Sequence, residues 1–193
     1  MSIRQGLKWL QSIENETFEK IRTGVTEGVK KKFVAQEIAR SVFLAHFPPG
    51  ESMATEGNWI CRYIFSGGLA AAAELDWKLE KAAKQLARGL LAGIRERGGD
   101  FMTGACTVVR SAIQCALLTK ADINKVTENV IGAVHKQGRE ENCNLEELLI
   151  GVSRTAVNAA QAFPKEDFKS IEQMFMGLLE GKTHFDEEGN YLH

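Results

Sequence analysis

The chain repeats a pair of helical segments, and this repeat constrains its fold more than any other feature. Residues 90–98 align with residues 130–138 at a shift of 40, and residues 108–116 align with residues 152–160 at a shift of 44. We assign the four extra residues of the second copy to a loop around residues 140–143, because loops tolerate insertions best. The pattern predicts αα-hairpin repeats of about 40–45 residues.

A third copy of the first segment follows near the C-terminal end, where residues 120–132 match residues 165–177. Pro164 precedes this copy, at a position that the first turn of a helix accepts. Elsewhere apolar residues recur at helical spacing, without the alternation that is typical of strands. We therefore predict an all-α fold of about six to eight helices, as a closed bundle or a short solenoid of degenerate repeats.

Breaks in this pattern divide one compact domain into four parts. We predict an N-terminal helical arm, a loop that begins at Pro48-Pro49, a helical-repeat core and a polar tail, because proline pairs end helices and the last residues lack helical spacing. These parts span residues 1–47, 48–57, 58–181 and 182–193.

Glycine and capping residues predict the helix ends within the core. We expect Gly67-Gly68 to break a helix and residues 69–97 to form one long helix, which Gly98 closes. Asp100 and Asn144 occupy equivalent places and are expected N-caps, since short polar side chains accept hydrogen bonds from free amides there.

Composition argues against several classes of protein. The 24 Lys and Arg balance the 25 Asp and Glu, so there is no strong signal for nucleic-acid binding. The chain has no apolar run long enough for a transmembrane segment, and its start does not resemble a signal peptide. Its 4 cysteines form no C-x-x-C pair, which is typical of reduced thiols. We expect a cytoplasmic protein.

Catalytic motifs are missing from the sequence. It contains no H-E-x-x-H, E-x-x-H or G-x-S-x-G pattern, so we predict a non-catalytic protein without a cofactor or resident metal. His135 with Glu140, Glu141 and Cys143 could ligate a divalent metal through the inserted loop, but this spacing fits no known motif. Since His135 takes the repeat position of Arg95, we interpret it as a surface residue.

Two arginines recur at equivalent repeat positions, Arg110 and Arg154. Together they could form an anion site, because guanidinium groups suit phosphate and carboxylate. Their helical neighbours are mostly polar, however, which favours a solvated helix face. We therefore expect both arginines to be exposed.

An apolar stripe near the N-terminus predicts self-association. It includes Ile3, Leu7 and Leu10, with Trp9 beside it, and belongs to residues 3–33, which predict one long helix or two in line. Such a helix would be about 45 Å long and would overhang a compact body, leaving the stripe in water unless a partner covers it. We predict a homo-oligomer or protein complex whose interface includes Leu7, Trp9 or Leu10.

Residues 34–40 and 46–48 together resemble the helix-turn-helix region of TetR-type repressors. That resemblance implies a DNA-binding arm, but residues 41–45 replace the turn and the recognition helix. We expect a protein that acts through protein–protein interaction or self-association. The alternatives are a small-molecule-binding helical protein, in one form a regulator with a degenerate DNA-binding arm, and a protein that associates with lipid surfaces.

Overall fold

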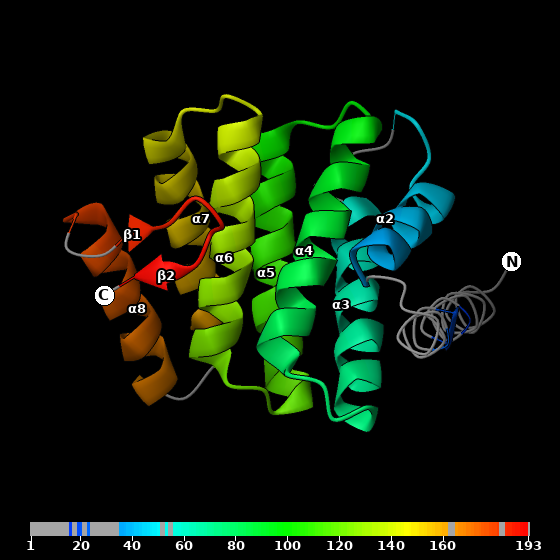
Figure 1. Cartoon of the computed structure of the whole chain (residues 1–193), viewed down its shortest axis with the longest axis horizontal. Coiled ribbons are helices and arrows are strands. Elements are labelled where there is room, and N and C mark those ends of the chain that lie inside the picture. Colours follow the sequence, from blue (N-terminus) through cyan, green and yellow to red (C-terminus); the bar gives the residue numbers. More distant parts are fainter. Residues whose placement is uncertain are drawn as a thin grey trace, which may run out of the picture.

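The computed structural model describes residues 35–50, 53, 56–161, 165–181 and 184–192, together with residues 16, 19, 20 and 23. The described residues form seven helices and a two-stranded hairpin, so the fold is all-α as predicted (Figure 1). The helices are α2 (Ala35–His46), α3 (Glu56–Glu74), α4 (Leu79–Glu96), α5 (Phe101–Thr119), α6 (Ile123–Glu140), α7 (Leu145–Ala160) and α8 (Lys165–Leu179). The hairpin pairs β1 (His184–Phe185) with β2 (Tyr191–Leu192) in antiparallel register.

The helices pack in two layers. Helix α4 lies between α2 and α6 in one layer, and α5 lies between α3 and α7 in the other. The apolar core fills the space between the layers, with side chains such as Leu86, Leu90 and Ile113 fully buried. Helix α8 packs against α7 and α6 and lies at one end of the array (Figure 1).

The helix boundaries recur at a constant interval of 22 residues. Helices α4, α5, α6 and α7 begin at Leu79, Phe101, Ile123 and Leu145. Within two residues of the end of each preceding helix lies a residue with a left-handed backbone, namely Asp76, Gly98, Lys120 or Asn142. Two consecutive helices therefore make a unit of 44 residues.

This interval corrects one part of the predicted repeat. The connections between α4 and α5 and between α6 and α7 are residues 97–100 and 141–144, which are equally long, so the predicted insertion around residues 140–143 is wrong. The shift of 40 misaligned α4 with α6 by about one helical turn, which keeps the same face buried and so looks plausible in sequence. Superposition of the two pairs in space stays a prediction.

The predicted break at Gly67-Gly68 is also wrong. Helix α3 runs through both glycines without interruption and ends at Glu74, and residues 75–78 separate it from α4. Gly68 instead provides room, because a methyl group at this position would lie 2.5 Å from Cδ1 of Leu86. The glycine therefore allows α4 to approach α3 closely.

The predicted capping residues are confirmed. Gly98 follows α4 with φ of +68°, where glycine carries no steric cost. The side chain of Asp100 accepts a hydrogen bond from the amide of Thr103 at 2.7 Å, and that of Asn144 accepts one from the amide of Glu147 at 3.3 Å.

Helix α2 is one continuous helix whose buried residues Ala35, Ala39 and Phe43 face the core. It packs on α4, and residues 47–50 after it are not helical. The two-helix unit that TetR-type repressors use is therefore not formed by residues 35–50. No helix in the described part of the chain combines the length and apolar character that a bilayer span requires.

Candidate functional site

The structure places the predicted site residues apart. Leu7, Trp9 and Leu10 lie outside the described residues. Arg110 on α5 and Arg154 on α7 are both exposed, as expected, and neither makes an ion pair with another described residue. Neither lines the hollows described below. The structure therefore adds no support for an anion site at these arginines.

The tail holds an ordered feature that the sequence pattern did not reveal. Its hairpin turns at Asp186, whose carboxylate accepts hydrogen bonds from the amides of Glu188 at 2.9 Å and Asn190 at 2.8 Å. These bonds hold the pKa of Asp186 below its usual range, with the amide of Asn190 as the main cause. Phe185 is buried although the tail around it is polar.

Two glycines let the hairpin lie directly on α6. A methyl group at Gly132 of α6 would lie 2.9 Å from the carbonyl carbon of Gly189 and overlap its oxygen. A methyl group at Gly189 would likewise lie 2.7 Å from the carbonyl carbon of Gly132. Gly189 also has φ of +69°, a conformation that other residues rarely adopt. The hairpin and α6 thus touch backbone to backbone.

Two lysines, one on α4 and one on α6, bind the hairpin through hydrogen bonds and an ion pair. Lys84 of α4 donates hydrogen bonds to the carbonyl oxygen of Gly189 at 2.9 Å and to Oδ1 of Asn190 at 3.0 Å. Lys136 of α6 pairs with Glu188 at 2.5 Å, and only 19% of the Lys136 side chain is exposed. Burial and the nearby charge of Arg88 lower the pKa of Lys84, while the hydrogen bond and charge of Lys136 lower the pKa of Glu188.

His135 is half-buried beneath the hairpin, which corrects its prediction as a surface residue. At the shift of 44 that separates the starts of α4 and α6, it aligns with the fully buried Leu91 and not with Arg95. Its ring lies 5.5 Å from that of Phe185, and its Nδ1 atom is buried without a hydrogen-bond partner in the described structure. Burial, and then the charge of Arg139, lower the pKa of His135 from its ordinary value of 6.5.

We expect the hairpin to loosen at acidic pH. The folded protein favours the neutral ring of His135, so this contribution to stability is present above pH 6.5 and is lost as pH falls through the lower pKa of the folded state. Hydrogen-exchange protection factors of residues 184–192 should therefore decrease severalfold between about pH 7 and pH 5. A His135→Leu variant should show no such decrease, and an unchanged pH dependence in it would contradict this role.

An open groove lies between the hairpin, α6 and α8, and we call it the C-terminal groove. It joins two hollows of about 210 and 240 Å³ that share Glu128 and Tyr191. Its other lining residues are Asn124, Asn129, Ser170, Gln173, Met174, Gly189 and Asn190. This lining offers hydrogen bonds and one carboxylate, but no cysteine or histidine nucleophile. It suits a polar ligand and not an apolar one.

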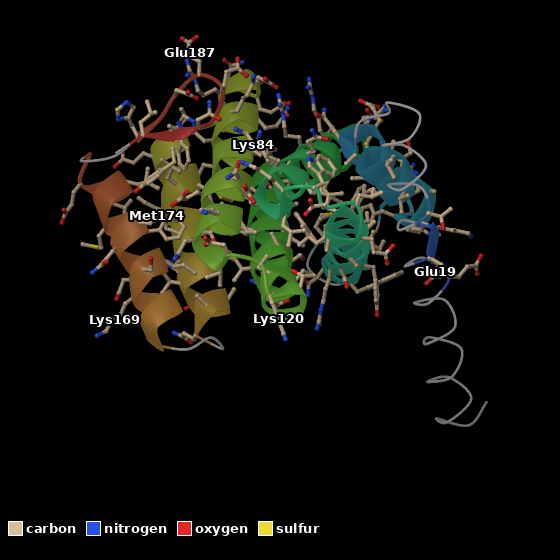
Figure 2. The ribbon with its side chains drawn as sticks, turned by 60° about the horizontal axis from the view of Figure 1, so that its bottom comes forward. Glu19, Lys84, Lys120, Lys169, Met174 and Glu187 are labelled. Carbon is tan, nitrogen blue, oxygen red and sulfur yellow. The ribbon has the colours of Figure 1, made fainter. Side chains whose placement is uncertain are left out.

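The outer side of α8 forms a second exposed surface, which we call the α8 face. Its inner side is buried through Ile171, Met174 and Phe175. The α8 face consists of Lys169, Glu172, Gln173, Met176, Leu179 and, just beyond the helix, Glu180. Met176 and Leu179 are 50% and 49% exposed, and Lys169 points away from the rest of the array (Figure 2).

The buried thiols indicate a role in packing and not in catalysis. Cys61 is fully buried, and burial raises the pKa of its thiol far above the usual value. Burial also raises the pKa of Cys115 to about 12. In the described part of the chain, no group of three or more His, Cys, Asp or Glu side chains could hold a metal, and this includes His135, Glu140, Glu141 and Cys143.

Comparison with known proteins gives no relative, since no model of a protein family matches the chain and no curated protein sequence matches it significantly.

Proposed function

We propose that the protein is a non-catalytic helical module that self-associates in the cytoplasm through the α8 face. The observation that carries the proposal is the exposure of Met176 and Leu179 on the last helix of the array. Of the four large apolar side chains exposed in the described part of the chain, three belong to residues 176–192. Water contact with such side chains costs about 25 cal/mol per Å² of apolar surface, which a partner helix would recover.

The position of α8 favours another helix as the covering partner. Helices α4 and α5 each have a neighbour on both sides within their layer, whereas α8 meets described helices through its inner side alone. A second copy of the chain can supply the missing neighbour through its own α8. A twofold axis would use the same face on both copies, as most homodimers do.

The charges of the α8 face suit an antiparallel pair of this kind. If the axis passes near residues 174–175, Lys169 lies opposite Glu180 of the partner subunit, and Met176 lies opposite Gln173 of the partner subunit. The residues between Lys169 and Glu180 span about 16 Å at 1.5 Å per residue, enough for two ion pairs around a small apolar centre. Opposite charges across an interface fix its register more than its affinity.

Light scattering at micromolar concentration tests the proposal. The wild type should have about twice the chain mass of 21.3 kDa. Leu179→Glu should weaken dimerisation at least about tenfold, because it removes apolar area and places an unpaired carboxylate in the interface. Ile150→Glu is the matched control, since Ile150 is 41% exposed on α7, outside the α8 face, and its change should leave the mass unaltered.

Charge exchange tests the register of the pair. Lys169→Glu and Glu180→Lys should each weaken the dimer, and the double variant should restore much of the loss. A monomeric wild type would refute self-association altogether. If Leu7→Glu lowers the mass and Leu179→Glu does not, the interface is the predicted N-terminal stripe and not the α8 face.

Binding of a small polar molecule in the C-terminal groove is a second candidate function. It is supported by the convergence of carboxamides and the Glu128 carboxylate on one hollow. The hollows described here are open and polar, unlike the enclosed apolar cavities of many ligand-binding proteins, so we rank this function below self-association.

A further inference from the structure

We infer that the surface beneath the hairpin is a docking site for an acidic segment of a partner protein, and that the hairpin is its internal competitor. We call this surface the basic cradle, and it consists of Lys84 and Arg88 of α4 with Lys136 and Arg139 of α6. The inference is independent of the α8 face.

The cradle gathers four cations from two helices that pack side by side. The charges of Arg88 and Lys136 both act on Lys84, and Arg88 also acts on Glu188. Arg139 and Lys136 line a further hollow of about 380 Å³ together with Glu140, Glu187 and Glu188. Like charges so close together repel one another, and an anionic occupant removes this cost.

The present occupant shows what kind of ligand the cradle accepts. The cradle binds the hairpin through the carbonyl of Gly189, the carboxamide of Asn190 and the carboxylate of Glu188. A turn of another protein that carries a carboxamide beside an acidic residue can present the same groups, because none of them requires that the turn belong to the same chain. Glu187 is exposed at the outer tip of the hairpin, away from the helices (Figure 2).

The hairpin is also weakly built as a unit. Its strands are two residues each, and a two-stranded hairpin alone is marginally stable in water. Its order therefore depends on the contacts beneath it, namely the two lysines, the glycine pair and the burial of Phe185. A competing segment that supplies equivalent charges can displace it.

A protein segment fits the cradle better than a nucleic acid. Lys84 binds a peptide carbonyl and a carboxamide, which are groups that a phosphate backbone lacks. The chain as a whole has a net charge of −1, which gives no general attraction for a nucleic acid.

In the test, a substitution displaces the hairpin from the basic cradle, and the hairpin sequence is then added as a separate peptide. In the Gly189→Ala chain, the new methyl group overlaps the Gly132 carbonyl while the cradle stays intact. A fluorescent peptide of residues 182–193 with the wild-type sequence should bind this variant saturably in an anisotropy titration. It should bind the wild-type chain at least about tenfold more weakly, because the resident hairpin occupies the site.

Controls separate docking from backbone strain and from charge alone. Gly181 also has φ of +69°, but a methyl group there has no atom within 4 Å, so Gly181→Ala should leave the cradle closed. A peptide with Asn for Asp186 and Gln for Glu187 and Glu188 should bind at least about tenfold more weakly, as expected for lost charge-assisted hydrogen bonds. Lys136→Gln in the Gly189→Ala chain should have a similar effect.

Hydrogen exchange at residues 184–192 reports whether the hairpin has left the cradle, and Phe185→Ser provides a second variant that frees it. If neither variant exposes these amides, the hairpin is a permanent part of the fold and the inference is wrong. It is also wrong if the freed cradle does not bind the peptide, or if it binds a single-stranded oligonucleotide as tightly.

Discussion

Leu86→Ala is expected to lower the free energy of unfolding by about 2–5 kcal/mol, the range for deleting a buried leucine side chain in a well-packed core. Leu86 lies on α4, is fully buried and fills the space over Gly68 of α3. Its removal leaves a cavity between the two layers, which the helices can close only in part. Urea denaturation followed by circular dichroism measures the loss.

The same contact predicts a coupling between the two positions. Gly68→Ala alone should destabilise the protein by about 1–3 kcal/mol, because its methyl group would lie 2.5 Å and 2.9 Å from the two terminal carbons of Leu86. In the double variant the new methyl group enters the cavity that Leu86→Ala creates. The loss of stability in the double variant should therefore be smaller than the sum of the two single losses. Strict additivity would contradict the close packing of α3 on α4.

Gly68 also shows why a sequence pattern can misplace a helix boundary. A glycine pair in a helical segment indicates a break when only the local cost of glycine is considered. Here the close approach of α4 decides the outcome, and this information lies 18 residues away at Leu86. The sequence signal for the true end of α3 is weaker. It is Asp76, whose backbone is left-handed, a conformation that aspartate tolerates better than most residues.

Local chemistry was predictable where one or two neighbouring residues determine it. Asp100 and Asn144 cap their helices and Gly98 ends α4, because each acts on amides or carbonyls within its own turn. The all-α class followed from helical spacing, which the buried faces of α4 and α6 confirm.

The repeat register and the environment of His135 were harder to predict for one shared reason. In helices rich in alanine and glycine, shifts of 40 and 44 residues place nearly the same faces inward, since they differ by about one turn. The choice between them decides whether His135 corresponds to Arg95 or to Leu91. Only the helix ends, fixed at Gly98 and Asn142, distinguish the two.

The sites at the C-terminal end depend on tertiary contacts that leave little trace in the sequence. Strands of two residues have no detectable alternation, and the hairpin is ordered by the contact of Gly189 with Gly132. The α8 face differs from an ordinary solvated face only because α8 is the last helix of the array. The order of packing, and not the composition of α8, makes Met176 and Leu179 candidates for an interface.

Gly89→Ala is expected to detach α2 from the array. A methyl group at position 89 of α4 would overlap the carbonyl oxygen of Gln36 and lie 2.9 Å from Cβ of Ala39. Alanine favours the helix by about 1 kcal/mol over glycine, but this gain cannot offset a clash with a backbone carbonyl, which no side-chain rotation relieves. We expect a net loss of about 2 kcal/mol or more, at the upper end of the range for overpacking.

Hydrogen exchange locates this effect. Protection of residues 35–46 should decrease the most, while that of α6 and α7 should stay near the wild-type level, because α2 packs mainly on α4 and α3. Gly151→Ala on α7 is the matched control, since the nearest atom to its methyl group is the flexible Sδ of Met102 at 3.0 Å. Uniform loss of protection over all helices would instead mean that α2 and the rest of the array unfold as one cooperative unit.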